Sequence, residues 1–437
     1  MTSTKFESKP LFTRQQLTAL LLPLIAEQAL SVTIGLADTL MVSSVGVAAV
    51  SGVSLVDTFN TLMIQIMTAL ATGGAVVASQ YIGHREEKNA RAAAAQILFI
   101  MSSFSVLVAA VVVVGRHSIL RGIFGAIDAD VMRYAETYFL LSALSYPFIG
   151  LYNAGAALFR AQGNSKISMM SSLVMNVVNI GGNAILIFGF GMGVMGAALA
   201  SLISRAVACC AVLFLLQKPD CMLRITGLSA LRPDGGLIRR ILRVGIPAGI
   251  ENGMFQIGKL SVASLTSTLG TAAIAANAVS MAVLTVVGQC LGAGEKEQAV
   301  WYARRLLLVA YCGAWVMNLS GFFFADRWAL SWFNLSPEAS AMALEVMMWF
   351  NIVSLFFWPS SFTLPNILRS AGDASFTMAV SIVSMWVFRV GFCYLWVLRM
   401  GGGLLSIWMG MYLDWVFRSL CFAVRFVRGR WLEKTVI

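Results

Sequence analysis

The chain has 437 residues, of which 59% are apolar and 12% are charged, and its mean hydropathy is +0.81. The charged fraction is about half that of an average soluble domain, so the composition excludes an ordinary soluble protein and indicates an integral membrane protein. The net charge of +11 does not indicate nucleic-acid binding, because the basic residues cluster in short polar connections between apolar runs.

Twelve apolar windows follow one another along the chain, each about as long as the ~20 residues that a spanning helix needs. In chain order they cover residues 17–41, 53–82, 93–115, 135–158, 168–190, 195–217, 244–268, 272–291, 304–324, 341–365, 375–398 and 403–424. The longest polar break separates the sixth window from the seventh. We therefore expect an all-α integral membrane protein of twelve transmembrane helices in two pseudo-symmetric six-helix bundles, residues 1–217 and 241–437, joined by a cytoplasmic linker at 218–240.

The distribution of Lys and Arg predicts the orientation of these helices. If the amino terminus lies inside, most of the 31 basic residues fall on the inner side. The outer loops then carry only Arg116, Arg121, Arg133, Arg327 and Arg399. Because inner loops are enriched in basic residues, we expect a multi-pass protein of the bacterial plasma (inner) membrane with both termini in the cytoplasm. We also expect a monomer with no nucleic-acid partner.

The second half of the chain repeats motifs of the first half. The run Pro-Leu-Ile-Ala-Glu-Gln at 23–28 returns as Pro-Ala-Gly-Ile-Glu-Asn at 247–252, and the run Arg-Ala-Gln-Gly-Asn at 160–164 returns as Arg-Ser-Ala-Gly-Asp at 369–373. An internal repeat with polar residues at matching depth is typical of secondary transporters.

The spacing of these repeats predicts that one helix is short. Glu27 and Glu251 are 224 residues apart, whereas Arg160 and Arg369 are 209 residues apart, so the second half lacks fifteen residues, all in the eighth window. Fifteen residues correspond to about 22 Å, or close to four turns of helix. We expect a shortened eighth helix that stays nearly in phase with its counterpart. A damaged or specialised second bundle is the alternative.

Carboxylates inside a span are candidate functional groups, because each costs roughly 2.5 to 3.5 kcal/mol at the helix centre on insertion scales. In the first window Glu27 and Asp38 fall on one face, since eleven residues at about 100° each return close to the starting direction. Gln28 adjoins this face. Asp38 aligns with Val262 in the second half, so the two halves are not functionally equivalent.

The fifth window contains three amides, Asn176, Asn179 and Asn183, of which the last two share a helix face. Such amides often hydrogen-bond neighbouring membrane helices. The alternative is that they hydrogen-bond Asp38 in a protonated or ion-bound form.

The seventh window carries Glu251, Asn252 and Gln256, which makes it unusually polar. We expect these residues to line a substrate cavity, with Glu251 helping to bind a cationic compound.

The last two windows carry buried charges. Asp414 and Arg418 are four residues apart in the order that favours a helical ion pair, and Arg389 lies on the preceding window. We expect these three residues to form a structural charge cluster, because an unpaired Arg at this depth would be costly.

Taken together, the motifs resemble those of the multidrug and toxic compound extrusion (MATE) family, prokaryotic type, over nearly the whole chain. The resemblance rests on the runs at 23–28, 35–39, 152–164, 185–189 and 193–198. It implies two six-helix bundles in a V shape that act as a secondary antiporter. Members export organic, often cationic, compounds in exchange for Na⁺ or H⁺, and the resemblance implies no other cofactor.

Individual residues can be carried over from this resemblance. Asp38 matches the first-span acid used for cation coupling, and Asn179 and Asn183 match a fifth-span Asn and Asp, so one coupling acid is missing here. Glu251 resembles a seventh-span Glu of another branch, whose tenth-span Asp is replaced by hydroxyls at 359–365.

We therefore expect an efflux antiporter that uses no metal site other than a possible Na⁺ position at Asp38, and that is not an enzyme. Its coupling group would comprise Asp38, Asn179 and Asn183. Its substrate cavity would be lined by Glu27, Gln28, Asn176, Glu251, Asn252 and Gln256. Two alternatives remain: a flippase for a lipid-linked precursor, which needs a basic cavity, and a homologue inactivated by the short eighth span.

Overall fold

The computed structural model describes residues 10–125, 127–225, 232–261, 270–324, 337–392, 394–396, 404–434 and 436–437. Within these ranges all regular elements are helical, as the sequence predicts. In chain order they are α1 (Arg14–Ser43), α2 (Val47–Gly83), α3 (Glu87–Phe124), α4 (Ala129–Ala161), α5 (Ser165–Asn183), η1 (Ala184–Gly189), α6 (Gly193–Gln217), α7 (Gly235–Ser261), α8 (Gly270–Gly292), α9 (Lys296–Phe324), α10 (Pro337–Ser370), α11 (Ala374–Ser384), η5 (Met385–Phe392), α13 (Leu404–Val427) and η6 (Arg430–Glu433). If the π-helical segments η1 and η5 are counted with the α-helices that they continue, these ranges contain twelve long helical rods.

The helices present apolar side chains on the outside of the molecule. Seven of the described helices are long and apolar enough to cross a membrane. Val114, Val177 and Phe214 are among the large apolar side chains that are more than half exposed. Lipid tails would cover such side chains, and a helix satisfies its own backbone hydrogen bonds in that medium. The surface therefore fits a bilayer.

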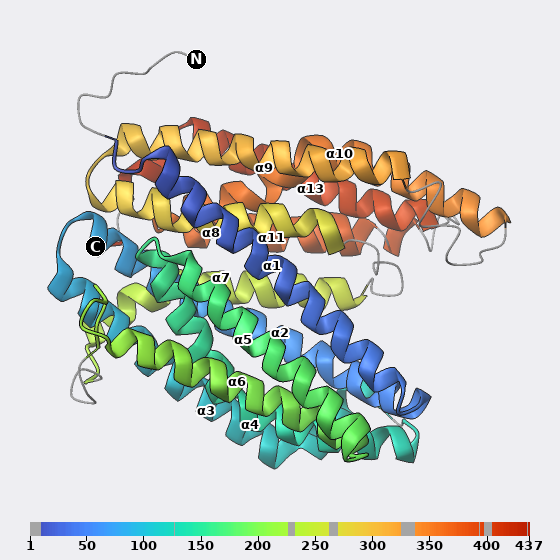
Figure 1. The fold of residues 1–437 in the computed structure, drawn as a ribbon. Helices are drawn as coiled ribbons and strands as arrows, with labels where there is room; N and C mark the ends of the chain where they lie inside the picture. The colour runs from blue at the N-terminus through green and yellow to red at the C-terminus, as the bar shows by residue number, and fades with distance from the viewer. Residues whose placement is uncertain are drawn as a thin grey trace.

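Helices α2 to α6 lie on one side of the molecule and α8 to α13 lie on the other, with α7 between them and α1 crossing from one side to the other (Figure 1). α7 packs closely on α2, since a Cβ on Gly73 would stand 2.7 Å from the backbone of Gly245. Small residues of this kind allow membrane helices to approach one another. α1 contacts both sides: Leu20 and Leu24 belong to the core of the second half, and Ser165 of α5 donates to the Leu20 carbonyl at 2.6 Å.

The connection between the halves is shorter than predicted. α7 begins at Gly235, inside the range 218–240 that the sequence assigns to a linker. The Asp234 carboxylate accepts a hydrogen bond from the backbone N–H of Gly236 at 2.8 Å, which caps the start of this helix. Residues 226–231 of the predicted linker lie outside the described residues.

α8 is the shortened helix that the repeat predicts. It has 23 residues, whereas its counterpart α2 has 37. Both helices end at the repeated glycine, Gly83 in α2 and Gly292 in α8, so α8 extends less far than α2 from this glycine. Residues 262–269, which precede α8, lie outside the described residues.

The two halves contact each other where α2 and α8 end, at the left of Figure 1. Gln80 Nε2 donates to the Ser370 carbonyl oxygen at 2.7 Å, and Gln289 Nε2 donates to the Ala161 carbonyl oxygen at 2.7 Å. Each glutamine thus binds the last turn of a helix in the other half. The halves diverge from this end toward the opposite one (Figure 1).

Glycines make this approach possible. A Cβ on Gly83 would overlap the backbone oxygen of Gln289, and a Cβ on Gly292 would overlap that of Gln80. We call the contact formed by these four residues the sealed end.

Both ends of the described chain lie near the sealed end. The backbone N–H of Leu11 donates to Gln298 Oε1 of α9 at 2.9 Å, and the backbone N–H of Val436 donates to Gln80 Oε1 at 3.2 Å. The two termini are therefore on the same side of the molecule.

Candidate functional site

A cavity of about 640 Å³ lies between the two halves. Its walls come from α1, α2, α4, α5 and α6 on one side and from α7, α8, α10, η5 and α13 on the other. The predicted site residues that line it are Glu27, Gln28, Asp38, Asn176, Asn179, Glu251, Asn252, Gln256, Arg389 and Arg418. Asn183 and Asp414 are fully buried behind this lining.

Asp38 of α1 is half-buried and accepts a hydrogen bond from Asn183 Nδ2 at 2.5 Å. The same amide contacts Asn179 Oδ1 at 3.3 Å, and Asn179 Nδ2 donates to Ser201 Oγ at 3.1 Å. These contacts connect α1 through α5 to α6. Within the described part of the chain, Asp38 has no ion-pair partner. The structure thus brings together the three residues predicted to couple to a cation.

Asn183 lies at the point where α5 passes into the π-helical segment η1. Single π-helical turns inside membrane or soluble helices frequently mark functional sites. Asn176 does not join the contact with Asp38, because its Nδ2 donates to the Ser172 carbonyl one turn earlier at 2.8 Å. Its Oδ1 is buried with no hydrogen-bond donor among the described residues.

A second carboxylate, Asp57 of α2, interacts electrostatically with Asp38. Asn60 Nδ2 donates to Asp57 Oδ1 at 3.3 Å. Arg205 of α6 interacts electrostatically with both carboxylates, and its Nη1 donates to Ser145 Oγ at 2.6 Å. Asp57 is near the start of its helix, and only the fold shows that it faces Asp38.

Glu27, by contrast, has a direct ionic partner. Arg160 Nη1 of α4 lies 2.9 Å from Glu27 Oε1 and also donates to Ser168 Oγ at 2.9 Å. Ser168 in turn donates to Glu27 Oε2 at 2.5 Å. Both carboxylate oxygens are therefore occupied, and the charge of this buried group is balanced.

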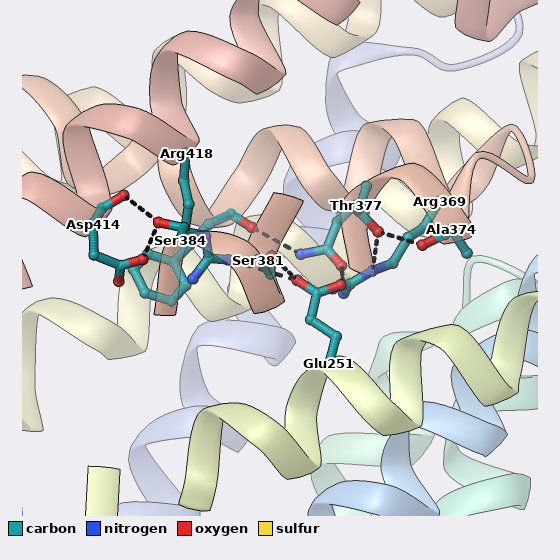
Figure 2. A network of polar contacts seen from close by, with 10 residues as sticks. Glu251, Arg369, Ala374, Thr377, Ser381, Ser384, Asp414 and Arg418 are labelled. Atoms are coloured by element: carbon teal, nitrogen blue, oxygen red, sulfur yellow. Dashed lines mark hydrogen bonds and ion pairs between the residues drawn. The ribbon is translucent and has the colours of Figure 1, made fainter. Parts of the chain in front are cut away.

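Glu251 has the equivalent environment in the second half (Figure 2). Its carboxylate forms an ion pair with Arg369 and accepts a hydrogen bond from Ser381 Oγ at 2.6 Å. Arg369 Nε contacts Thr377 Oγ1 at 3.4 Å, which repeats the contact between Arg160 and Ser168. Since the carboxylate is already compensated by arginine, the prediction that Glu251 helps to bind a cationic substrate is not supported.

The predicted ion pair within α13 is wrong. Arg418 Nη2 lies 3.6 Å from Glu251 Oε1, and Asp414 instead accepts hydrogen bonds from Ser384 Oγ (Figure 2). Arg389 stands over the Phe255 ring with its guanidinium carbon 5.2 Å from the ring centroid. The three charged residues are buried close together. Arg418, however, pairs with Glu251 of α7 and not, as the spacing along α13 predicts, with Asp414.

The partners of Glu27 and Glu251 could have been found in the sequence. Arg160 and Arg369 belong to the repeated runs that identified the two halves, as do the two glutamates. A carboxylate and an arginine that both recur in a repeat, each at membrane depth, are expected to pair in each half, because neither charge is stable alone in lipid.

We expect Glu27→Gln to lower the stability of the protein, because it leaves the buried Arg160 without a counter-charge. Removing one partner of a buried pair typically costs about 3–5 kcal/mol. Thermal unfolding in detergent should show a clear fall in Tm, and Glu27→Gln combined with Arg160→Met should restore part of it. The control is Arg91→Gln, which breaks an exposed pair with Glu87 on α3 and should change stability by less than about 1 kcal/mol. If Glu27→Gln and Arg91→Gln lowered Tm by the same amount, the ion pair between Glu27 and Arg160 would not be structural.

A helical membrane protein whose two related halves close on a polar cavity has the architecture of a secondary transporter. The family model described as MatE matches residues 23–185 and 251–395, which is more than half of the chain. The chain therefore belongs to the MatE family of multidrug and toxic compound extrusion transporters.

Relatives and solved structures agree with this assignment. The chain is 26% identical to the "Probable multidrug resistance protein NorM" of Thermotoga maritima, over 97% of the chain and 94% of that protein. A structure described as "Reverse polarity of binding pocket suggests different function of a MOP superfamily transporter from Pyrococcus furiosus" has the same fold, with a TM-score of 0.85, 21% identity and coverage of 96% and 97%. An "Outward-facing conformation of a multidrug resistance MATE family transporter" matches with a TM-score of 0.83 and 21% identity over 95% and 94%.

The family assignment settles the class of the protein. The chain is an integral membrane transporter of multidrug-efflux type that acts on small molecules, and it is not an enzyme.

Proposed function

We propose that this transporter exports organic small molecules across the bacterial inner membrane in exchange for H⁺ or Na⁺, with Asp38 as the coupling carboxylate. The observation that carries the proposal is the difference between the three acids that line the cavity. Glu27 and Glu251 each form an ion pair with an arginine, whereas Asp38 forms no ion pair among the described residues and accepts a hydrogen bond from the neutral amide of Asn183.

This difference matters because a coupling group must change its charge during the cycle. A carboxylate bound to arginine loses a favourable ion pair when it is neutralised, whereas Asp38 gains from neutralisation in a half-buried site. Asn179 and Asn183 supply amide oxygens and N–H groups that can hydrogen-bond the protonated acid or a bound Na⁺. Asn179 and Asn183 are therefore compatible with either H⁺ or Na⁺ as the coupling ion.

The sealed end supports an orientation for the cycle. The connection after α2 carries His84 and Arg85, and the linker before α7 carries further basic residues. Under the positive-inside rule this end faces the cytoplasm, together with both termini, and the cavity is closed toward the cytoplasm in this conformation. Export then requires the two halves to rock against each other so that the sealed end opens and admits cargo from the cytoplasm.

The two alternatives are less well supported. Relatives that the chain matches include probable multidrug resistance proteins, which favours export of small molecules over transfer of a lipid-linked precursor, and Arg160 and Arg369 each bind a glutamate and are not available for pyrophosphate. The alternative of a protein inactivated by its short α8 is also less well supported, because α8 still reaches the sealed end, where Gly292 packs directly on the backbone of Gln80. A monomeric state remains a prediction.

The arginines in the described lining of the cavity outnumber its acids, which favours a negatively charged cargo over the cationic one that the resemblance implies.

The proposal is tested with purified protein in proteoliposomes, measuring dye movement while Na⁺ is varied at fixed pH and then while pH is varied without Na⁺. Movement driven by one of these two gradients supports cation-coupled export. If neither gradient moves any of a panel of anionic, neutral and cationic dyes, the proposal fails.

A further inference from the structure

The charges that line the cavity are unequally distributed between its two halves. In the first half Glu27 and Asp38 face Arg160 and Arg205, so acids and bases are equal in number. In the second half the charged residues of the lining, within the described part of the chain, are Glu251, Arg369, Arg389 and Arg418. Three arginines against one carboxylate leave an excess of positive charge, which remains if the buried Asp414 behind them is included.

Two buried donors on α13 lack an acceptor among the described residues. Arg418 is 3% exposed, and its Nε–H has no hydrogen-bond partner among the described residues. Trp415 is 2% exposed, and its Nε1–H likewise has none. The two residues are three apart on α13 and line the same cavity, so their donors share one face of the helix. Buried N–H groups without acceptors are costly, and an anion would satisfy both.

Aromatic rings surround these donors and hold the guanidinium groups in place. The Arg418 guanidinium carbon lies 5.0 Å from the Phe362 ring centroid, and that of Arg389 lies 5.2 Å from the Phe255 centroid. Trp415 packs edge-on against Phe350 at 5.7 Å. Such rings stabilise cations and offer flat apolar surface to a planar ligand.

We propose that the second half of the cavity is an anion subsite, in which Arg418 and Trp415 bind the carboxylate or sulfonate group of an aromatic organic anion. Arg389 contributes positive charge from η5, and Phe255, Phe350 and Phe362 contact the apolar part of the ligand. This inference rests on the proposed export function and defines the chemical class of the cargo. It also separates the two tasks of the cavity, since the coupling cation binds at Asp38 in the first half.

The test compares two dyes with the same xanthene core and opposite charge, the anion 6-carboxyfluorescein and the cation rhodamine 6G. Equilibrium binding to the purified protein in detergent is followed by fluorescence anisotropy. Wild-type protein should bind 6-carboxyfluorescein at least about tenfold more tightly than rhodamine 6G. Arg418→Gln should weaken binding of the anion by about tenfold or more, because a charge-assisted hydrogen bond in a dry site is lost.

Trp415→Phe is the sharper variant, because it removes an N–H group that no acceptor among the described residues uses, changes no charge and keeps an aromatic ring. It should weaken 6-carboxyfluorescein binding by about threefold to tenfold and leave rhodamine 6G unchanged. Matched controls are Trp315→Phe on α9, whose indole binds the Leu355 carbonyl outside the cavity, and Arg425→Gln on α13, which pairs with Asp373. Both controls should bind the dyes as wild type does.

The outcomes separate this inference from the proposed function. Tighter binding of rhodamine 6G by wild type, or 6-carboxyfluorescein binding unaffected by Trp415→Phe and Arg418→Gln, overturns the anion subsite. Gradient-driven export of rhodamine 6G without export of 6-carboxyfluorescein also overturns the subsite and leaves export established. If neither dye is moved by either gradient although 6-carboxyfluorescein binds as expected, the subsite stands as a binding site and the export proposal is the one that fails.

Discussion

Asp38→Asn is expected to abolish gradient-driven export while the protein remains folded. Asparagine has almost the same shape and can still accept the hydrogen bond from Asn183, but it cannot take up and release a proton or compensate a bound Na⁺. Asp38 has no ion-pair partner in the described chain, so the substitution leaves no buried charge unpaired and stability should change by less than about 1 kcal/mol. Export should fall at least about tenfold in proteoliposomes, to the level of protein-free vesicles.

The matched control for this prediction is Asp130→Asn, an exposed carboxylate in the first turn of α4. It should export as wild type does. If Asp38→Asn exports at the wild-type rate under the same gradient, Asp38 does not couple cation movement to export. A variant that loses both export and its normal Tm would instead assign Asp38 a structural role.

Gly83→Ala is expected to open the sealed end and stop transport. The new Cβ would overlap the backbone oxygen of Gln289, and a backbone atom cannot move aside as a flexible side chain can. Overpacking of this kind typically costs about 1–3 kcal/mol, enough to shift the equilibrium of a two-state transporter by about fivefold to more than a hundredfold. Export should therefore fall strongly, although both bundles remain folded.

Cys290 reports directly on this opening. It follows Gln289 on α8 and is fully buried beside the sealed end. Maleimide should label Cys290 faster in Gly83→Ala than in wild type, as measured by mass spectrometry of the modified peptide. Gly181→Ala on α5 is the control, because a Cβ there meets nothing within 4 Å. Equal labelling and full export in Gly83→Ala would contradict a seal built on glycine contact.

Much of the fold could be predicted because its determinants are local or repeated. Apolar windows fix where helices cross the membrane, and the difference in spacing between repeats identified the short α8 before any contact was known. The capped start of α7 was missed because its first two turns combine two glycines and two arginines with only a few apolar residues, as a loop can. Hydropathy alone does not separate a polar helix from a linker.

The candidate site was predictable only in part. The approach of Asn183 to Asp38 followed from the rarity of polar residues in spans, since buried polar groups need partners. The pairing of Arg418 was predicted wrongly, because the spacing rule for helices considers only one helix and Glu251 lies on another. Glu27 and Arg160 are 133 residues apart, and nothing but the repeat relates them in the sequence. Asp57 carries no such signal.

The contacts at the sealed end have a consequence for the origin of this architecture. Gln80 and Gln289 each donate to the last turn of a helix in the other half, and Gly83 and Gly292 each pack on the backbone of the other half's glutamine. The contacts are therefore reciprocal. This reciprocity is the defining property of an isologous interface between identical subunits. A six-helix ancestor could thus have formed the same sealed end by dimerising. Gene fusion would then have allowed one half to specialise in binding the coupling cation and the other in binding an anion through its arginines.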